Sequence, residues 1–153
     1  MRIIVAGLGY VGLTNAVLLA QNNTVIALDI DAARVELVNA RQPPIADPEL
    51  EEFLKNHELD LSATLDAQHA YSRADYVIVT TLTNYDLRTD FFDTATVEAV
   101  IEQVIAINPS AVIVIKSTIP VGFVDQARAK FATDNIIFLP EFLREGRALY
   151  DNL

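Results

Sequence analysis

The sequence predicts an α/β fold built on a doubly wound, Rossmann-like parallel sheet. Strand and helix patterns alternate along all 153 residues, as they do in such folds. Two continuous β-branched runs, 75–81 and 111–116, are typical of strands buried on both faces of a parallel sheet. A glycine-rich turn follows the first predicted strand. Because crossovers are right-handed and the turn follows the first strand, we expect the strand order 3-2-1-4-5-6 in one domain, residues 1–153.

The individual elements follow from periodicity and from turn residues. Strands are expected at 2–6, 24–29, 59–64, 75–81, 111–116 and 135–139, and helices at 11–21, 31–40, 48–56, 66–72, 94–107 and 120–132. In 94–107 the apolar residues recur at helical spacing, with Glu98 and Glu102 on the other side. The segment 82–93 is rich in Thr, Asn and Asp, has no apolar period, and is expected to be a long loop.

The first strand leads directly into Gly7-Leu8-Gly9-Tyr10-Val11-Gly12. In a G-x-G-x-x-G turn the first glycine permits a tight turn, the second lets backbone approach a pyrophosphate, and the third lets the helix pack against the strand. The phosphates would lie at the helix N-terminus, where unpaired N–H groups point outward. The motif alone is a weak signal, since glycine-rich turns are common.

Asp29 strengthens this interpretation, because it closes the second strand about 20 residues after the first glycine. Its carboxylate can accept hydrogen bonds from ribose hydroxyls and would repel a 2′-phosphate, which favours NAD over NADP. The alternative is a surface glycine turn in which Asp29 is the N-cap of the next helix. Arg34 lies near the expected adenosine and is either a cofactor contact or a solvent-facing helix residue.

Composition excludes several function classes. The formal net charge is −10 and no basic cluster stands out, so we expect no nucleic-acid partner. There is no cysteine, hence no disulfide, thiolate metal site or cysteine nucleophile within these residues, and we expect no metal site. The N-terminus is already a strand, and no apolar run approaches membrane-spanning length. These features favour a cytoplasmic protein with no membrane partner.

The segment Lys116–Gly122 follows directly on the C-terminal end of a buried strand. Pro120 suits the first turn of the next helix, and Ser117 or Thr118 then suits its N-cap. The alternative places the Thr118 hydroxyl in a ligand crevice outside the strand ends.

The segment Pro140–Gly146 follows the last strand. If it is helical, Glu141 and Glu145 fall on one face, where two close carboxylates push one pKa upward. Such a pair could orient water or shuttle protons. The alternative is an ordinary acidic first helical turn, paired with Arg144 or Arg147.

Several strings together resemble one family. They are the Gly7–Gly12 turn, Leu28-Asp29, KSTIPVG at 116–122, PEFLREG at 140–146 and the closing Tyr150-Asp151-Asn152-Leu153. Over essentially its whole length the chain resembles the N-terminal, NAD-binding part of bacterial UDP-glucose 6-dehydrogenases, in the UDP-glucose/GDP-mannose dehydrogenase family. KSTIPVG and PEFLREG are far more specific than the glycine motif. Dehydrogenases of GDP-mannose or UDP-N-acetyl sugars share parts of the pattern, and the YDNL ending favours UDP-glucose.

The resemblance implies an NAD-dependent oxidoreductase of nucleotide-sugar and polysaccharide biosynthesis. UDP-glucose is oxidised to UDP-glucuronate in a four-electron reaction that reduces two NAD. In the family a cysteine captures the aldehyde formed by the first hydride transfer, and water hydrolyses the thioester formed by the second. Covalent capture keeps the aldehyde from escaping between the two oxidations.

Site residues are also implied by the resemblance. The implied cofactor-binding residues are Gly7, Gly9, Tyr10, Val11, Gly12, Asp29, Arg34, Thr83, Thr118 and Glu145. Thr118 resembles a threonine that positions the catalytic water, Glu145 a carboxylate that assists hydrolysis, and Glu141 a second acid at the sugar. The implied substrate-pocket residues are Glu141, Phe142, Leu143, Arg144 and Tyr150.

Two departures from the family pattern bear on function. The family usually carries proline where this chain has Leu82, and the loss of a fixed φ is expected to loosen the loop near the nicotinamide. The family's nucleophilic cysteine, catalytic lysine and UDP-binding domain correspond to positions beyond Leu153. We therefore expect this chain to be inactive alone, as part of an enzyme that is a homodimer or larger. The alternatives are a non-catalytic NAD-binding module and the NAD domain of a related GDP-mannose or UDP-N-acetyl-sugar dehydrogenase.

Overall fold

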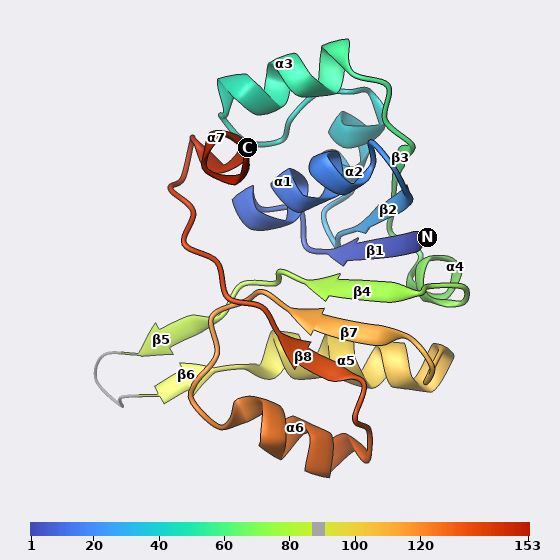
Figure 1. The fold of residues 1–153 in the computed structure, drawn as a ribbon, viewed down its shortest axis with the longest axis vertical. Helices are drawn as coiled ribbons and strands as arrows, with labels where there is room; N and C mark the ends of the chain where they lie inside the picture. The colour runs from blue at the N-terminus through green and yellow to red at the C-terminus, as the bar shows by residue number, and fades with distance from the viewer. Residues whose placement is uncertain (87–90) are drawn as a thin grey trace.

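A six-stranded parallel sheet forms the centre of the molecule (Figure 1). The structure is a computed structural model that describes the backbone of residues 1–86 and 91–153. The sheet consists of β1 (Arg2–Ala6), β2 (Thr24–Leu28), β3 (Leu61–Thr64), β4 (Tyr76–Val79), β7 (Val112–Ile115) and β8 (Ile136–Phe138). Their spatial order is β3-β2-β1-β4-β7-β8. Counted along the chain among the strands of this sheet, that order is 3-2-1-4-5-6, which confirms the predicted doubly wound fold.

Helices cover both faces of the sheet (Figure 1). They are α1 (Tyr10–Leu19), α2 (Ala32–Asn39), α3 (Pro48–Asn56), α4 (Ala67–Tyr71), α5 (Ala95–Ile107), α6 (Phe123–Phe131) and α7 (Ala148–Asn152). One core cluster joins α1, α2, α3 and α7 to the sheet, and the other joins α4, α5 and α6. Because successive strand residues point to opposite faces, Ile3 and Val5 enter the first cluster and Ile4 the second.

The register places the carboxyl ends of five strands along one edge of the sheet. Ala6 is paired with both Leu28 and Val79, Val79 with Ile115, and Ile115 with Phe138. The segments that follow β1, β2, β4, β7 and β8 therefore leave the sheet side by side. In an open parallel sheet this edge is where ligands bind.

Three expectations about secondary structure were wrong. The expected loop 82–93 contains a short antiparallel hairpin, β5 (Asn84–Asp86) and β6 (Phe91–Asp93). The last long helix begins at Phe123 rather than 120, because Gly122 turns the chain with φ +84° immediately before it. The C-terminal helix α7 was not expected, since five residues carry too little periodicity to predict one. Among the described residues, no helix is long and apolar enough to span a membrane.

Candidate functional site

The glycine turn after β1 has the geometry that its three glycines predict. Gly7 has φ +106°, and its N–H donates to the Leu28 carbonyl at 2.8 Å. A Cβ on Gly12 would lie 1.8 Å from the Gly7 carbonyl oxygen, so α1 packs directly on the turn. A Cβ on Gly9 would meet no atom within 4 Å. The turn is therefore tightly packed behind Gly7 and Gly12 and open in front of Gly9.

The open side of this turn is the N-terminus of α1. Gly9 is the N-cap and provides no side-chain hydrogen bond. The N–H groups of the first helical turn, from Tyr10, Val11 and Gly12, have no intrahelical acceptors. Together with the positive end of the helix dipole, they form a site for an anion such as a pyrophosphate. The open space in front of Gly9 lets such a group approach the backbone.

Asp29 lies directly beside the glycine turn. Its Oδ2 accepts from the Leu8 N–H at 2.7 Å, and its Oδ1 accepts from the Asp31 N–H at 3.0 Å. The alternative in which Asp29 caps the next helix is wrong, because Asp31 is the N-cap of α2 and accepts from Ala33 at 2.9 Å. Each Asp29 oxygen keeps a second lone pair, so the carboxylate can still accept hydrogen bonds from ribose hydroxyls.

Arg34 lies in the first turn of α2. Its Nε is 3.6 Å from Asp31 Oδ2, and both side chains are substantially exposed. An exposed pair of this kind stabilises the fold by little. The guanidinium is therefore free to exchange this contact for one with a cofactor.

The loop after β4 is held by hydroxyl groups. The Ser117 hydroxyl donates to the Thr81 carbonyl at 2.6 Å, and the Thr96 hydroxyl donates to the Leu82 carbonyl at 2.6 Å. Both bonds fix the backbone just before Thr83 at a place where the resemblance led us to expect a looser loop. The side chain of Leu82 itself is exposed.

Thr118 does not cap a helix. The N-cap of α6 is Gly122, so neither Ser117 nor Thr118 has the capping role that we considered. Ser117 is buried and directed to the β4 loop, whereas Thr118 is exposed. Within the described part of the chain the Thr118 hydroxyl has no hydrogen-bond partner, and it remains available to a ligand.

The segment 140–147 is not helical, so Glu141 and Glu145 do not share a helical face as an i, i+4 pair. The alternative of an acidic first helical turn is wrong for the same reason. The segment leaves β8 in an irregular path, and its start is fixed by the Leu139 N–H, which donates to the Ile115 carbonyl at 2.9 Å. Glu141 follows two residues later and is near enough to Lys116, the residue after β7, for the lysine charge to act on its carboxyl group. Glu145 is exposed.

Glu141 has an incompletely satisfied carboxyl group. Its Oε2 is buried and has no hydrogen-bond partner among the described residues. Burial raises the pKa of the Glu141 carboxyl above its usual value, and the positive charge of Lys116 offsets part of that rise. A partly buried acid with one buried, unpaired oxygen is suited to hold or transfer a proton.

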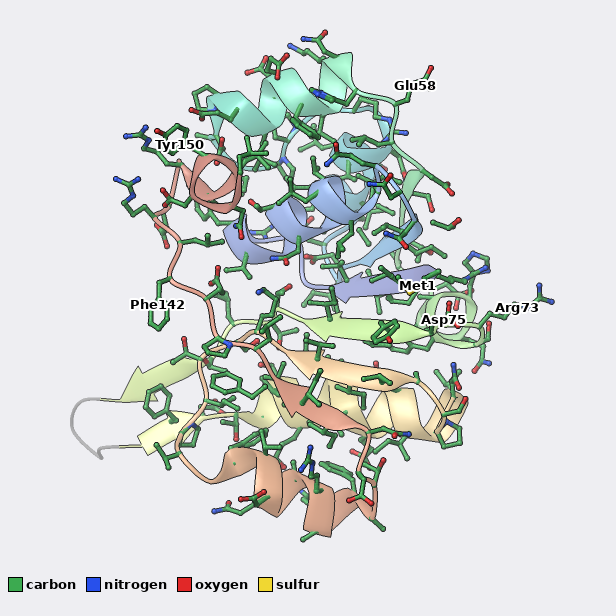
Figure 2. The ribbon with its side chains drawn as sticks, in the orientation of Figure 1. Met1, Glu58, Arg73, Asp75, Phe142 and Tyr150 are labelled. Carbon is green, nitrogen blue, oxygen red and sulfur yellow. The ribbon has the colours of Figure 1, made fainter. Side chains whose placement is uncertain are left out.

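Aromatic and charged side chains surround the rest of this segment. Phe142 is 94% exposed and points outward from the connection between β8 and α7 (Figure 2). Arg144 binds Asp151 through Nη2 at 2.5 Å and Nε at 3.1 Å, and its backbone N–H donates to the same carboxylate at 3.0 Å. The Arg147 guanidinium lies 4.6 Å from the ring centre of Tyr150. Leu143 is partly buried.

All 153 residues match the UDP-glucose/GDP-mannose dehydrogenase family, NAD binding domain. The chain belongs to this family. It is 51% identical over 153 residues to a UDP-glucose 6-dehydrogenase of Streptococcus pneumoniae and 43% identical over 155 residues to one of Campylobacter jejuni. All of this chain is covered in both matches, but it spans only 39% of the length of each relative. A UDP-glucose dehydrogenase structure from Pyrobaculum islandicum superposes with a TM-score of 0.82 at 32% identity, over 99% of this chain and 38% of that one.

Some structural contributors to this NAD-binding domain were missed in the sequence. The Thr80 hydroxyl lies 2.9 Å from the Ala6 carbonyl and 3.0 Å from the Gly7 carbonyl, and it supports the back of the glycine turn. Ser117 and Thr96 support the β4 loop in the same way. Thr80 directly follows β4 at the carboxyl edge of the sheet, and that position could have indicated it. The contact of Thr96 with Leu82 carries no local sequence signal.

Proposed function

We propose that this chain is the NAD-binding domain of an enzyme that oxidises UDP-glucose to UDP-glucuronate. One observation carries the proposal: the strand register brings the glycine turn, Asp29, Thr118 and Glu141 to the same edge of the sheet. The first two suit a dinucleotide, Thr118 is exposed, and Glu141 has a buried Oε2 without a partner among the described residues. The two bacterial relatives at 51% and 43% identity are both named as UDP-glucose 6-dehydrogenases, which supports this sugar.

In this proposal the N-terminal turn of α1 binds the pyrophosphate through the backbone of Gly9, Tyr10, Val11 and Gly12. Asp29 accepts hydrogen bonds from the adenosine ribose and disfavours a 2′-phosphate by charge repulsion. Arg34 lies beside the adenosine. Thr83 contacts the cofactor from the loop after β4. When bound here, NAD supplies the hydride acceptor for each oxidation.

In this proposal the residues after β7 and β8 act in the hydrolysis step of the reaction. Thr118 and Glu145 orient the water that attacks the acyl intermediate, and both also border the cofactor. Glu141, with its raised pKa, holds a proton next to the sugar. Phe142, Leu143, Arg144 and Tyr150 line the pocket for the nucleotide sugar.

This chain contains no cysteine, so covalent capture of the aldehyde needs a residue from outside it. We propose that the cysteine, the lysine and the UDP-binding domain belong to the remaining length that its relatives possess. The chain alone then binds NAD without turnover. The alternative, a domain that serves only to bind NAD, would also bind NAD without turnover. The two proposals differ in the complete protein, which contains a cysteine-bearing region only if it is the enzyme.

The test is a turnover assay of the complete protein against UDP-glucose, GDP-mannose and UDP-N-acetyl-glucosamine, with NAD and with NADP. We expect the highest kcat/KM with UDP-glucose and NAD, and about two NADH formed per sugar oxidised, as the two-step oxidation requires. A preference for GDP-mannose would make the chain the NAD-binding domain of a GDP-mannose dehydrogenase instead. Absence of turnover with every sugar, together with retained NAD binding, would favour the binding module.

A further inference from the structure

The segment between β8 and α7 has neither helix nor strand between residues 140 and 147, although the proposed function places most sugar contacts there. A segment without the backbone hydrogen bonds of a helix or sheet must be held in place by groups elsewhere in the fold. At its start the anchor is the hydrogen bond from Leu139 to Ile115. At its end, Ala148 and Leu149 are completely buried.

Asp47 provides a second anchor at that end. Asp47 is only 3% exposed. Oδ1 accepts from the Leu50 N–H at 3.1 Å and so caps α3, while Oδ2 accepts from the Ala148 N–H at 3.0 Å, 101 residues later in the chain. One carboxylate therefore satisfies the first turns of two helices that are remote in sequence, α3 and α7.

We propose that Asp47 is a positioning residue for the nucleotide-sugar segment 141–150. The proposal rests on the proposed function for its substrate, but the contacts that carry it are independent of that function. Asp47 fixes Ala148 at the first residue of α7. Further along α7, Asp151 holds Arg144 through one backbone and two side-chain hydrogen bonds. Asp47 therefore fixes the start of α7, and α7 in turn fixes Arg144 through Asp151.

Gly146 adds a steric reason for this arrangement. It has φ +76°, which lets the chain reverse into α7, and a Cβ built on it would lie 3.6 Å from the Ala46 carbonyl oxygen. The carbonyl of the residue just before Asp47 therefore lies next to the turn that precedes Ala148. The two chain segments touch at neighbouring points, so a change at Asp47 should shift the segment instead of only loosening α3.

The glycine turn is held by different groups, the Leu28 carbonyl and the Thr80 hydroxyl. Loss of the Asp47–Ala148 bond should therefore raise KM for the sugar and leave KM for NAD unchanged. A purely structural role has another kinetic signature. It would reduce the fraction of folded enzyme, lowering apparent kcat while leaving both KM values alone.

The test uses Asp47→Ser in the complete protein. Serine is a good N-cap, so it can keep the bond to Leu50, but its side chain is too short to reach Ala148 as well. The matched control is Asp66→Ser, because Asp66 also caps a helix by accepting from His69 at 3.0 Å, on the other face of the sheet. We expect KM for the preferred nucleotide sugar to rise about tenfold or more in Asp47→Ser and less than twofold in Asp66→Ser.

Unchanged KM for the sugar in folded Asp47→Ser would overturn the proposal, as would an equal rise in KM for NAD. Hydrogen exchange on the same proteins tests the anchor without turnover. Faster exchange in 143–150 with unchanged exchange in 2–28 would support it, and unchanged exchange in 143–150 would overturn it. If the wild-type protein oxidises no sugar, the proposed function fails, and exchange still decides whether Asp47 anchors the segment. If Asp47→Ser does not fold, the isosteric Asp47→Asn takes its place in both measurements.

Discussion

The carboxylate of Asp29 accepts a hydrogen bond of 2.7 Å from the backbone N–H of Leu8, inside the glycine turn. The end of β2 and the turn after β1 are therefore fixed to each other by the residue that we propose as the ribose ligand. A carboxylate oriented by backbone donors has a defined direction before any cofactor arrives. Such preorganisation lowers the entropic cost of binding.

We predict that Asp29→Ala weakens NAD binding by about 1–3 kcal/mol, the scale of losing hydrogen bonds to a charged group. Isothermal titration calorimetry of the purified chain with NAD measures this directly. Asp60→Ala is the matched control, since Asp60 is an exposed aspartate whose Oδ2 accepts from the Thr24 hydroxyl at the opposite edge of the sheet. Equal NAD affinity in Asp29→Ala and wild type would contradict the ribose role.

Gly9 and Gly12 should respond to the same substitution in opposite ways. A Cβ on Gly12 would lie 1.8 Å from the Gly7 oxygen, so Gly12→Ala must move α1 off the turn, at a cost of about 1–3 kcal/mol or more. A Cβ on Gly9 meets only open space, so Gly9→Ala should unfold at the wild-type temperature. It should nevertheless lose NAD affinity, because the methyl group projects where the pyrophosphate approaches. Thermal unfolding with and without NAD separates the two effects, and a destabilised Gly9→Ala would contradict this account.

The sequence was informative where local pattern and chain topology determine structure. Alternating strand and helix patterns predicted the fold class, and right-handed crossovers with the turn after the first strand predicted the order of all six sheet strands. Glycine spacing predicted the packed and open sides of the Gly7–Gly12 turn. Both follow from short-range sterics and from the handedness of crossovers.

Predictions failed where a distant group decides the local conformation. The 140–147 segment has acidic residues at helical spacing, yet it is irregular, and the residues on either side of it are bound to Ile115 and Asp47. The late start of α6 has a local cause instead: Pro120 suits a helix start, but the left-handed conformation of Gly122 delays the helix to Phe123. The Asp47–Ala148 bond spans 101 residues, and no pattern in either segment indicates the other.

The Arg144–Asp151 pair should make stability depend on pH in the acid range. Hydrogen bonds from Arg144 lower the pKa of Asp151 from 3.8 to about 2. A depressed native pKa stabilises the fold above the unfolded value, and that contribution is lost as pH falls from 3.8 through about 2. Urea unfolding of wild type and Asp151→Asn between pH 5 and 2 should show a steeper acid loss in wild type. The difference should shrink at high salt because the Arg144 side chain of the pair is 62% exposed, and parallel profiles would contradict the assignment.

Glu141 should make the stability of the fold depend on pH in the opposite direction. Burial raises its native pKa above the usual 4.5, so the folded state binds a proton more tightly than the unfolded state does. Stability from the protonated form is complete below 4.5 and is lost as pH rises through the native pKa. Glu141→Gln has no such titration. Wild type should therefore lose stability relative to Glu141→Gln as pH rises from 4 to 8. Glu145→Gln is the matched control, because it removes an exposed carboxylate from the same segment and leaves Glu141 in place. In the complete protein the Glu141→Gln variant should lose turnover while keeping NAD affinity, whereas a variant with wild-type kcat would show that the buried carboxyl group takes no part in the reaction.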